Sequence, residues 1–123
     1  MAILESGENY LESILKLSQT KDGVHAIDVV NDLNFSKASV STMLKKLKDE
    51  GYITIDGENH LHLSDKGLAI AEKIYERHKV ITDILIRLGV DPVTAEDDAC
   101  KVEHDLTEDS FAAIKKYYIE KIK

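Results

Sequence analysis

The sequence predicts a mainly α-helical fold with one small β-hairpin, and three observations carry this prediction. Apolar residues recur at helical spacing along most of the 123 residues, whereas one short segment alternates with the period of a strand. Serine or threonine, the residues typical of helix N-caps, precede several of the helical segments. The chain has no Pro/Gly-rich linker and a single proline, Pro92.

The first half of the chain contains three of the predicted helices. Residues 8–17 and 24–33 each carry an apolar stripe, and a turn around Asn34 and Phe35 follows the second stripe. Ser36 is predicted to cap a third helix, which runs to Gly51 and places Val40, Met43, Leu44 and Leu47 on its apolar face.

A β-hairpin is predicted directly after the third helix. Residues 52–55 alternate as a strand and Leu61 and Leu63 alternate on the return strand. The Asp56-Gly57 pair predicts a tight turn, although the polar Glu58 and Asn59 also allow a longer loop. Helix, helix, turn, helix and hairpin are the order of a winged helix-turn-helix, while two short amphipathic helices also occur as ordinary core scaffolding.

The second half is predicted to be helical throughout. Ser64 is a plausible cap for a long helix that ends at Gly89 and turns Ile70, Ile74, Ile81, Leu85 and Leu88 inward. Pro92 suits the first turn of a helix over about residues 92–104. Thr107 caps a last helix, which carries Phe111, Ile114, Tyr118 and Ile122.

Composition limits the class of protein. Apolar residues make up 43% and charged residues 32% of the chain, which is typical of a soluble globular protein of one domain or two small subdomains. The N-terminus lacks the pattern of a signal peptide, and no stretch approaches the roughly 18 apolar residues of a membrane span. The lone Cys100 excludes an internal disulfide and favours a reducing compartment, so we expect a cytoplasmic protein.

The charge is distributed unevenly. The net charge of −7 argues against a general polyanion binder, yet residues 36–48 contain four lysines and no acid. Lysine, serine and threonine on the third helix can contact phosphates and base edges, so we interpret this helix as a DNA reader. The alternative is a solvated lysine-rich surface helix. The predicted DNA contacts are Ser36, Lys37, Ser39, Thr42, Lys45 and Lys46.

Three residues with metal-binding chemistry recur at helical spacing in the acidic segment 89–113. Cys100, Glu103 and His104 lie at positions i, i+3 and i+4, so on a helix they share one face. Thiolate, carboxylate and imidazole together suit a transition metal better than calcium or magnesium. Taken singly, each has a plain alternative: a buried cysteine behaves as a small hydrophobe, and glutamate and histidine are common on an acidic helix.

Further donors must come from other segments, because three ligands on one helix rarely complete a site. His78 lies one turn beyond Ile74 beside the apolar stripe of the long helix, where it is either a partly buried, satisfied histidine or a ligand. Asn9 and Glu12 lie at i and i+3 on the first helix, where simple surface polarity is the alternative.

Two other functions stay open at this point. One is a small helical metal-binding or redox enzyme that uses Cys100 and His104. However, the chain contains no P-loop, no GxGxxG, no HExxH and no EF-hand loop, and no oxyanion loop is recognisable. The other is a winged-helix regulator that responds to a small molecule and needs no metal.

The chain resembles the diphtheria-toxin-repressor family of metal-dependent transcriptional repressors, including its manganese transport regulator branch. The resemblance covers about residues 8–115, and the specific segments are "ACKVEHDL" and "ERHK". The other segments that carry it, in order and spacing, are "ENYLESILKL", "SVSTMLKKLKDEGYI" and "LSDKGLAIAEKIYERHKVITDIL".

The resemblance implies a winged helix-turn-helix DNA-binding domain over residues 1–66 and a helical metal-binding and dimerisation domain over residues 67–123. It implies a homodimer that binds a palindromic operator in double-stranded DNA, with Fe(II) or Mn(II) as corepressor. It places Cys100, Glu103 and His104 on primary ligands, and Glu12 and His78 on ligands of the manganese branch.

The sequence departs from the family pattern at two points. Asn9 stands where the iron branch has methionine and the manganese branch has aspartate. The iron-type members usually add a C-terminal SH3-like domain, whereas this chain ends at Lys123, so it combines the length of the manganese branch with the cysteine of the iron branch. Because a thiolate is a soft ligand, the chemistry leans toward Fe(II) over Mn(II).

Overall fold

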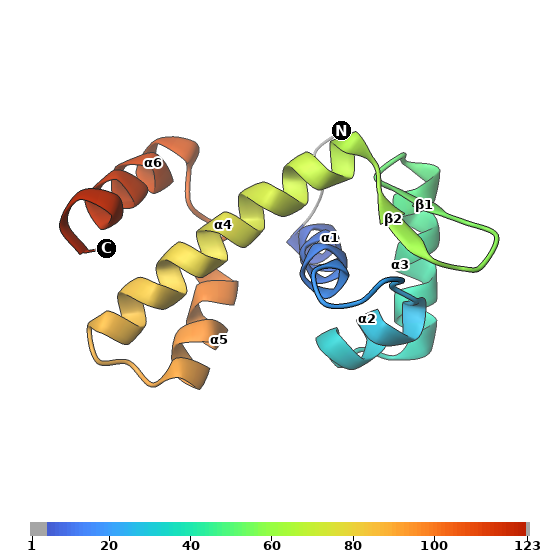
Figure 1. The fold of residues 1–123 in the computed structure, drawn as a ribbon, viewed down its shortest axis with the longest axis horizontal. Coiled ribbons are helices and arrows are strands. Elements are labelled where there is room, and N and C mark those ends of the chain that lie inside the picture. The colour runs from blue at the N-terminus through green and yellow to red at the C-terminus, as the bar shows by residue number, and fades with distance from the viewer. Residues whose placement is uncertain (1–4, 123) are drawn as a thin grey trace. The chain divides into compact units, whose positions relative to one another are not determined.

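The computed structural model describes residues 5–122, which divide between Lys73 and Ile74 into two compact units. The first unit contains α1 (Glu5–Ser18), α2 (Ala26–Leu33), α3 (Lys37–Asp49), β1 (Ile53–Ile55), β2 (Leu61–Leu63) and the beginning of α4 (Asp65–Arg87). The second unit contains the rest of α4, α5 (Pro92–Val102), α6 (Glu108–Tyr117) and a π-helical turn (Tyr118–Ile122). Figure 1 shows these elements.

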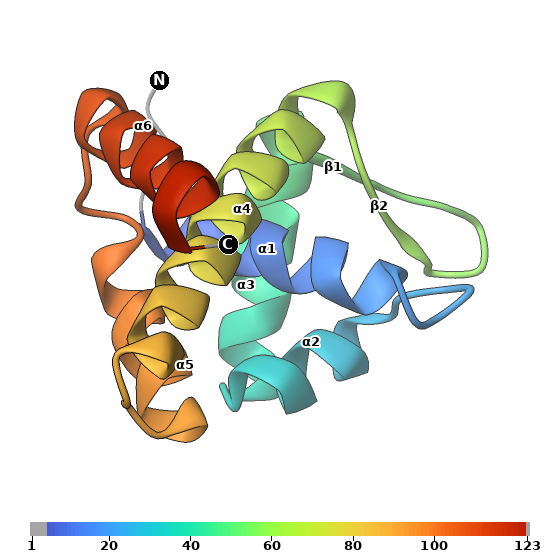
Figure 2. The same ribbon diagram turned by 60° about the vertical axis from the view of Figure 1, so that its left-hand side comes forward.

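The first unit is a three-helix bundle with a hairpin beside α3, as Figures 1 and 2 show. Its core takes Leu11 and Ile14 from α1, Val29 from α2, and Val40 and Leu47 from α3, all at most 1% exposed. Burying a side chain of this size stabilises the fold by about 1.5–3 kcal/mol, so the apolar stripes predicted from the sequence account for the packing of the three helices.

The connection between α2 and α3 is fixed by two local interactions. Asn34 adopts a left-handed conformation with φ 59°, which asparagine tolerates better than most residues, and its N–H bonds to the carbonyl of Val30. Ser36 then accepts a hydrogen bond from the N–H of Ser39 as the N-cap of α3. The predicted turn and cap are both confirmed.

The hairpin, which we call the wing, pairs β1 with β2 in antiparallel register, with Thr54 opposite His62. Its loop covers residues 56–60 and is longer than a two-residue turn. Asn59 takes the left-handed conformation in this loop, and its N–H bonds to the carbonyl of Asp56. The longer of the two predicted loop forms is therefore the one observed. At the other end of β2, Ser64 caps α4 by accepting from the N–H of Gly67.

The second unit follows the predicted helix order, with two corrections. Leu88 was predicted to face inward but is 76% exposed. The helix ends at Arg87, and Gly89, with φ 103°, reverses the chain, so Leu88 no longer follows the helical period. The helix predicted over residues 92–104 ends at Val102. Within residues 5–122, no helix is long and apolar enough to cross a membrane.

Capping residues explain the starts of α5 and α6. Asp91 accepts hydrogen bonds from the N–H groups of Val93 and Thr94, and Pro92 occupies the first turn. Thr107 accepts from the N–H of Ser110, as predicted from the sequence. The chain between these two helices, residues 103–107, is short and therefore holds its side chains close to both helix ends.

Candidate metal centre and DNA-binding surface

Glu103 is a fully buried acid in the second unit. It follows the last residue of α5 in a helical conformation, and its side chain has no exposed surface. Its Oε2 lies 3.0 Å from Nδ1 of His78, while its Oε1 lies 3.5 Å from Nε2 of His104. Glu103 thus lies close to two histidines, His78 on α4 and His104 in the connector between α5 and α6.

One oxygen of this carboxylate lacks hydrogen bonds. Oε1 of Glu103 is buried and accepts no hydrogen bond from any of residues 5–122. An uncompensated buried carboxylate costs several kcal/mol, because the charge is removed from water and the attraction of partners must replace its hydration. A cation held between this oxygen and the neighbouring imidazoles would remove that cost. Carboxylate and imidazole donors fit a transition metal, so the residues present are suited to one.

The other predicted metal ligands lie on two elements. Cys100 is half-buried on α5, one helical turn before Glu103. Asn9 and Glu12 are half-buried on α1 of the first unit. Because α5 ends at Val102, Cys100, Glu103 and His104 do not all belong to one helix as predicted, and Glu103 and His104 instead follow its end. The roles of all these residues as ligands remain predictions.

Arg77 is a residue near this cluster that the sequence interpretation missed. It is 3% exposed, and its Nη1 donates to the carbonyl oxygens of Glu103 (3.0 Å) and Leu106 (2.6 Å). A signal for it was present in the sequence: position 77 falls between Ile74 and Ile81 on the apolar stripe of the long helix, where a charged residue requires a buried partner.

The predicted DNA-reading residues lie on or beside α3 in the first unit. Lys37, Ser39, Thr42, Lys45 and Lys46 are exposed on this helix. Ser36 is exposed as well, but its hydroxyl is engaged as the N-cap. Two hollows flank the helix. One, of about 810 Å³, is lined by lysines 37, 45 and 48 together with α2 and the wing; the other, of about 680 Å³, is lined by Ser39, Thr42 and Lys46 with α1.

Replacing Lys45 or Lys46 by alanine is expected to weaken binding to every DNA sequence. Each exposed ammonium that contacts a phosphate releases about one counterion, so each loss should reduce the slope of log affinity against log salt by about one unit. Ser39→Ala or Thr42→Ala should instead change the discrimination between sites. Fluorescence anisotropy at several salt concentrations measures both effects. Wild-type binding by all four variants would place the DNA surface elsewhere.

Asp56 organises the wing through both of its carboxylate oxygens. Oδ1 accepts the N–H groups of Glu58 (2.8 Å) and His60 (2.9 Å), and Oδ2 lies 2.9 Å from Nε2 of His62. The hydrogen bond from His62, followed by that from the backbone of His60, lowers the pKa of Asp56 well below its ordinary value. The ring of His60 also stacks edge-on against His25, with the centroids 4.7 Å apart.

The Asp56 carboxylate is therefore expected to stabilise the wing in its ionised form. Because the folded-state pKa of Asp56 is lowered, its contribution is present above the unfolded-state pKa, about 3.9, and is lost as the pH falls through the folded-state value. Asp56→Asn should lower the melting temperature at pH 7 by a few degrees. The difference in melting temperature from wild type should become progressively smaller as the pH falls below about 4. Thermal melts across this pH range measure it; a difference that stays constant with pH would contradict this assignment.

The first unit defines the chain as a DNA-binding protein of the winged helix-turn-helix class. "Iron dependent repressor, N-terminal DNA binding domain" matches residues 2–61, and "Iron dependent repressor, metal binding and dimerisation domain" matches residues 64–120. The chain belongs to this family of metal-dependent transcriptional regulators, the family of the diphtheria-toxin and manganese transport regulators. The resemblance seen in the sequence is confirmed.

Individual relatives cover most of the chain. The HTH-type transcriptional regulator MJ0568 of Methanocaldococcus jannaschii is 34% identical over 97% of this chain and 96% of its own length. The HTH-type transcriptional regulator MntR of Listeria monocytogenes is 31% identical over 89% of this chain and 77% of its own length. Both are similar over the two matched domains.

Solved structures show the same fold. The manganese regulator SloR is 25% identical with a TM-score of 0.80, over 90% of this chain. The metal-dependent transcriptional regulator MtsR is 27% identical with a TM-score of 0.81, over 89% of this chain. The chain spans about half the length of these two proteins, 52% in each case. The predicted fold class, a winged helix-turn-helix followed by a helical dimerisation domain, is confirmed. The family consists of transcriptional repressors and not of enzymes, so the enzyme alternative is set aside.

Proposed function

We propose that this chain is a homodimeric repressor for which Fe(II) or Mn(II) acts as corepressor, and that it controls metal-uptake genes from a palindromic operator. The observation that carries the proposal is the buried Oε1 of Glu103, which accepts no hydrogen bond from the described residues and lies beside the His104 imidazole. A cytoplasmic location and a DNA partner go with this proposal.

The proposed ligands come from both units. Glu12 and Asn9 belong to α1, whereas the second unit contributes His78, Cys100, Glu103 and His104. A bound divalent ion supplies positive charge that several of these donors share. Metal binding would then act as a shift of population between states that already exist. In a dimer, the two α3 helices must lie about 34 Å apart to enter successive major grooves.

The choice between iron and manganese rests on two opposing observations. Cys100 offers a soft thiolate, which favours Fe(II) over the harder Mn(II). In contrast, SloR, which shares the fold and 25% of the aligned residues, is a manganese regulator. We therefore include both ions, and a competition between them on the purified chain decides the preference.

The test is operator binding with and without metal. The metal-free full chain is mixed with a labelled palindromic DNA, and binding is followed by mobility shift as Fe(II) or Mn(II) is added under anaerobic conditions. The expected result is an increase in affinity of at least tenfold with metal, which a chelator reverses. Equal affinity with and without either ion would contradict the proposal and favour a metal-independent winged-helix regulator.

A further inference from the structure

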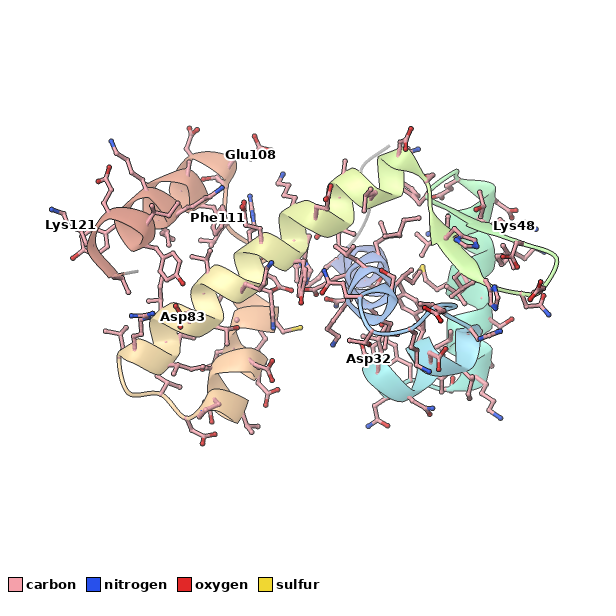
Figure 3. The ribbon with its side chains drawn as sticks, viewed as in Figure 1. Asp32, Lys48, Asp83, Glu108, Phe111 and Lys121 are labelled. Atoms are coloured by element: carbon pink, nitrogen blue, oxygen red, sulfur yellow. The ribbon has the colours of Figure 1, made fainter. Side chains whose placement is uncertain are left out.

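Arg77 is a buried cation in the second unit whose hydrogen bonds go to main-chain atoms. Its Nη1 donates to the carbonyl oxygens of Glu103 and Leu106, at 3.0 and 2.6 Å. Its guanidinium carbon lies 5.2 Å from the ring centroid of Phe111 on α6. The Arg77 side chain of α4 therefore bonds to two residues of the connector between α5 and α6, residues 103–107. It also contacts α6, the helix that follows this connector. Phe111 is labelled in Figure 3.

The neighbouring residue His78 holds the same glutamate by its side chain. Nδ1 of His78 lies 3.0 Å from Oε2 of Glu103. Consecutive residues of α4 thus fix Glu103 at two points, the carbonyl through Arg77 and the carboxylate through His78. Since both anchors sit on one helix, the direction of the remaining oxygen, Oε1, is set by α4. His104 lies within the same fastened connector, between the two carbonyls that Arg77 binds.

We propose that Arg77 is a positioning residue for the metal centre, which sets metal affinity by holding Glu103 and His104 in place. This inference rests on the proposed function. Residues that orient metal ligands through hydrogen bonds typically change metal affinity 10- to 100-fold when they are replaced, because the ligands must otherwise be ordered at the moment of binding.

The burial of Arg77 supports a role beyond filling space. An apolar side chain of similar volume could pack against Phe111 without removing a charge from water. Arg77 instead stays charged at 3% exposure, and its Nε makes no hydrogen bond to the described residues. The donors that it does use are aimed at the two carbonyls of the connector. Burying the guanidinium costs free energy that packing against Phe111 does not require. Its two hydrogen bonds, in contrast, fix the position of the connector.

The experiment measures metal binding by the folded full chain, with Mn(II) or Co(II) alone as the probe. Arg77→Lys keeps the charge but offers a single ammonium in place of the planar guanidinium, so electrostatic repulsion of the ion is unchanged while the two-carbonyl contact is lost. Arg77→Gln removes the charge as well. Lys79→Met is the matched control, because Lys79 is an exposed cation of the same helix that lies 4.6 Å from the ring centroid of Tyr75.

Affinity is measured well below the melting temperature of each variant, so that a loss of stability alone leaves it unchanged. Arg77→Lys and Arg77→Gln should each bind Mn(II) about tenfold or more weakly, and the Co(II) absorption spectrum should change because the ligand geometry changes. Lys79→Met should match wild type in both measurements.

Three results overturn the inference. If folded Arg77→Lys has the Mn(II) affinity and the Co(II) spectrum of wild type, the hydrogen bonds of Arg77 to the connector are not needed to position the ligands. Tighter binding by Arg77→Gln would show that the charge acts by repulsion. Failure of both variants to fold would assign Arg77 to folding alone. In contrast, absence of metal binding by the wild-type chain would be a failure of the proposed function, and it is read directly from the same titration.

Discussion

Replacing His104 by alanine is expected to abolish the metal-stimulated increase in DNA binding while the chain stays folded. The His104 side chain is 2% exposed and its Nε2 lies 3.5 Å from the Glu103 oxygen that accepts no hydrogen bond. A neutral imidazole donates a nitrogen lone pair directly, so its loss removes a complete ligand from the proposed site. We expect at least a hundredfold loss of metal affinity, measured by titrating Mn(II) or Fe(II) against operator anisotropy.

The matched control for His104→Ala is His62→Ala. His62 is an exposed histidine of the wing, outside the proposed metal site. Its replacement can change the affinity for DNA itself, but the ratio of affinities with and without metal should equal that of wild type. If His104→Ala and wild type give the same ratio, the metal-sensor hypothesis is wrong, whatever the absolute affinities are.

Gly67→Ala is expected to destabilise the first unit strongly, although alanine is the better helix former. A β-carbon at position 67 would lie 2.1 Å from the carbonyl oxygen of Tyr52. That oxygen belongs to the backbone and accepts the N–H of Ser64, so it cannot move without opening the junction between the wing and α4. The clash should cost about 3 kcal/mol, which exceeds the roughly 1 kcal/mol gained in helix propensity.

Thermal unfolding measures the Gly67→Ala effect as a decrease of about 10 °C in melting temperature. Gly57→Ala is the control, because a β-carbon at position 57 meets no atom within 4 Å and this glycine does not take the left-handed conformation. Its melting temperature should stay within 2–3 °C of wild type, as surface substitutions generally do. A stable Gly67→Ala variant would show that the Tyr52 carbonyl can shift after all.

Features that depend on neighbouring residues were predictable from the sequence. The caps Ser36 and Thr107 are local, because each side chain accepts the N–H of the residue three positions later. The turn at Asn34 is local as well, because its backbone N–H bonds to the carbonyl of Val30, four residues earlier. The order of helices and hairpin followed from hydrophobic periods. Helix ends were less predictable: α5 stops at Val102 and not at residue 104, although Glu103 keeps helical backbone angles and its N–H still bonds to the carbonyl of Ala99.

Features that depend on tertiary contacts were not predictable. The spacing of Cys100, Glu103 and His104 indicated metal chemistry, and the family resemblance grouped His78 with them; spacing alone could not show that Glu103 would contact His78, twenty-five residues earlier in the chain. The fastening of the connector by Arg77 also joins segments far apart in sequence. Similarly, the hydroxyl of Tyr118 bonds to Asp83, and this contact joins the last helical turn to α4 without any sequence signature. Figure 3 labels Asp83.

The contact between the wing and the loop before α2 has a consequence for solubility. A two-stranded sheet presents open edges, and unpaired N–H and C=O groups at such an edge recruit strands from other molecules. Here the outward-facing N–H of Leu61 in β2 already donates to the carbonyl of Val24, at 2.7 Å. The loop therefore occupies the position that an incoming strand would take on that side. Leu61 is also 5% exposed, so this position of the edge offers little apolar surface to a second chain, and the pairing of an incoming strand is hindered at Leu61.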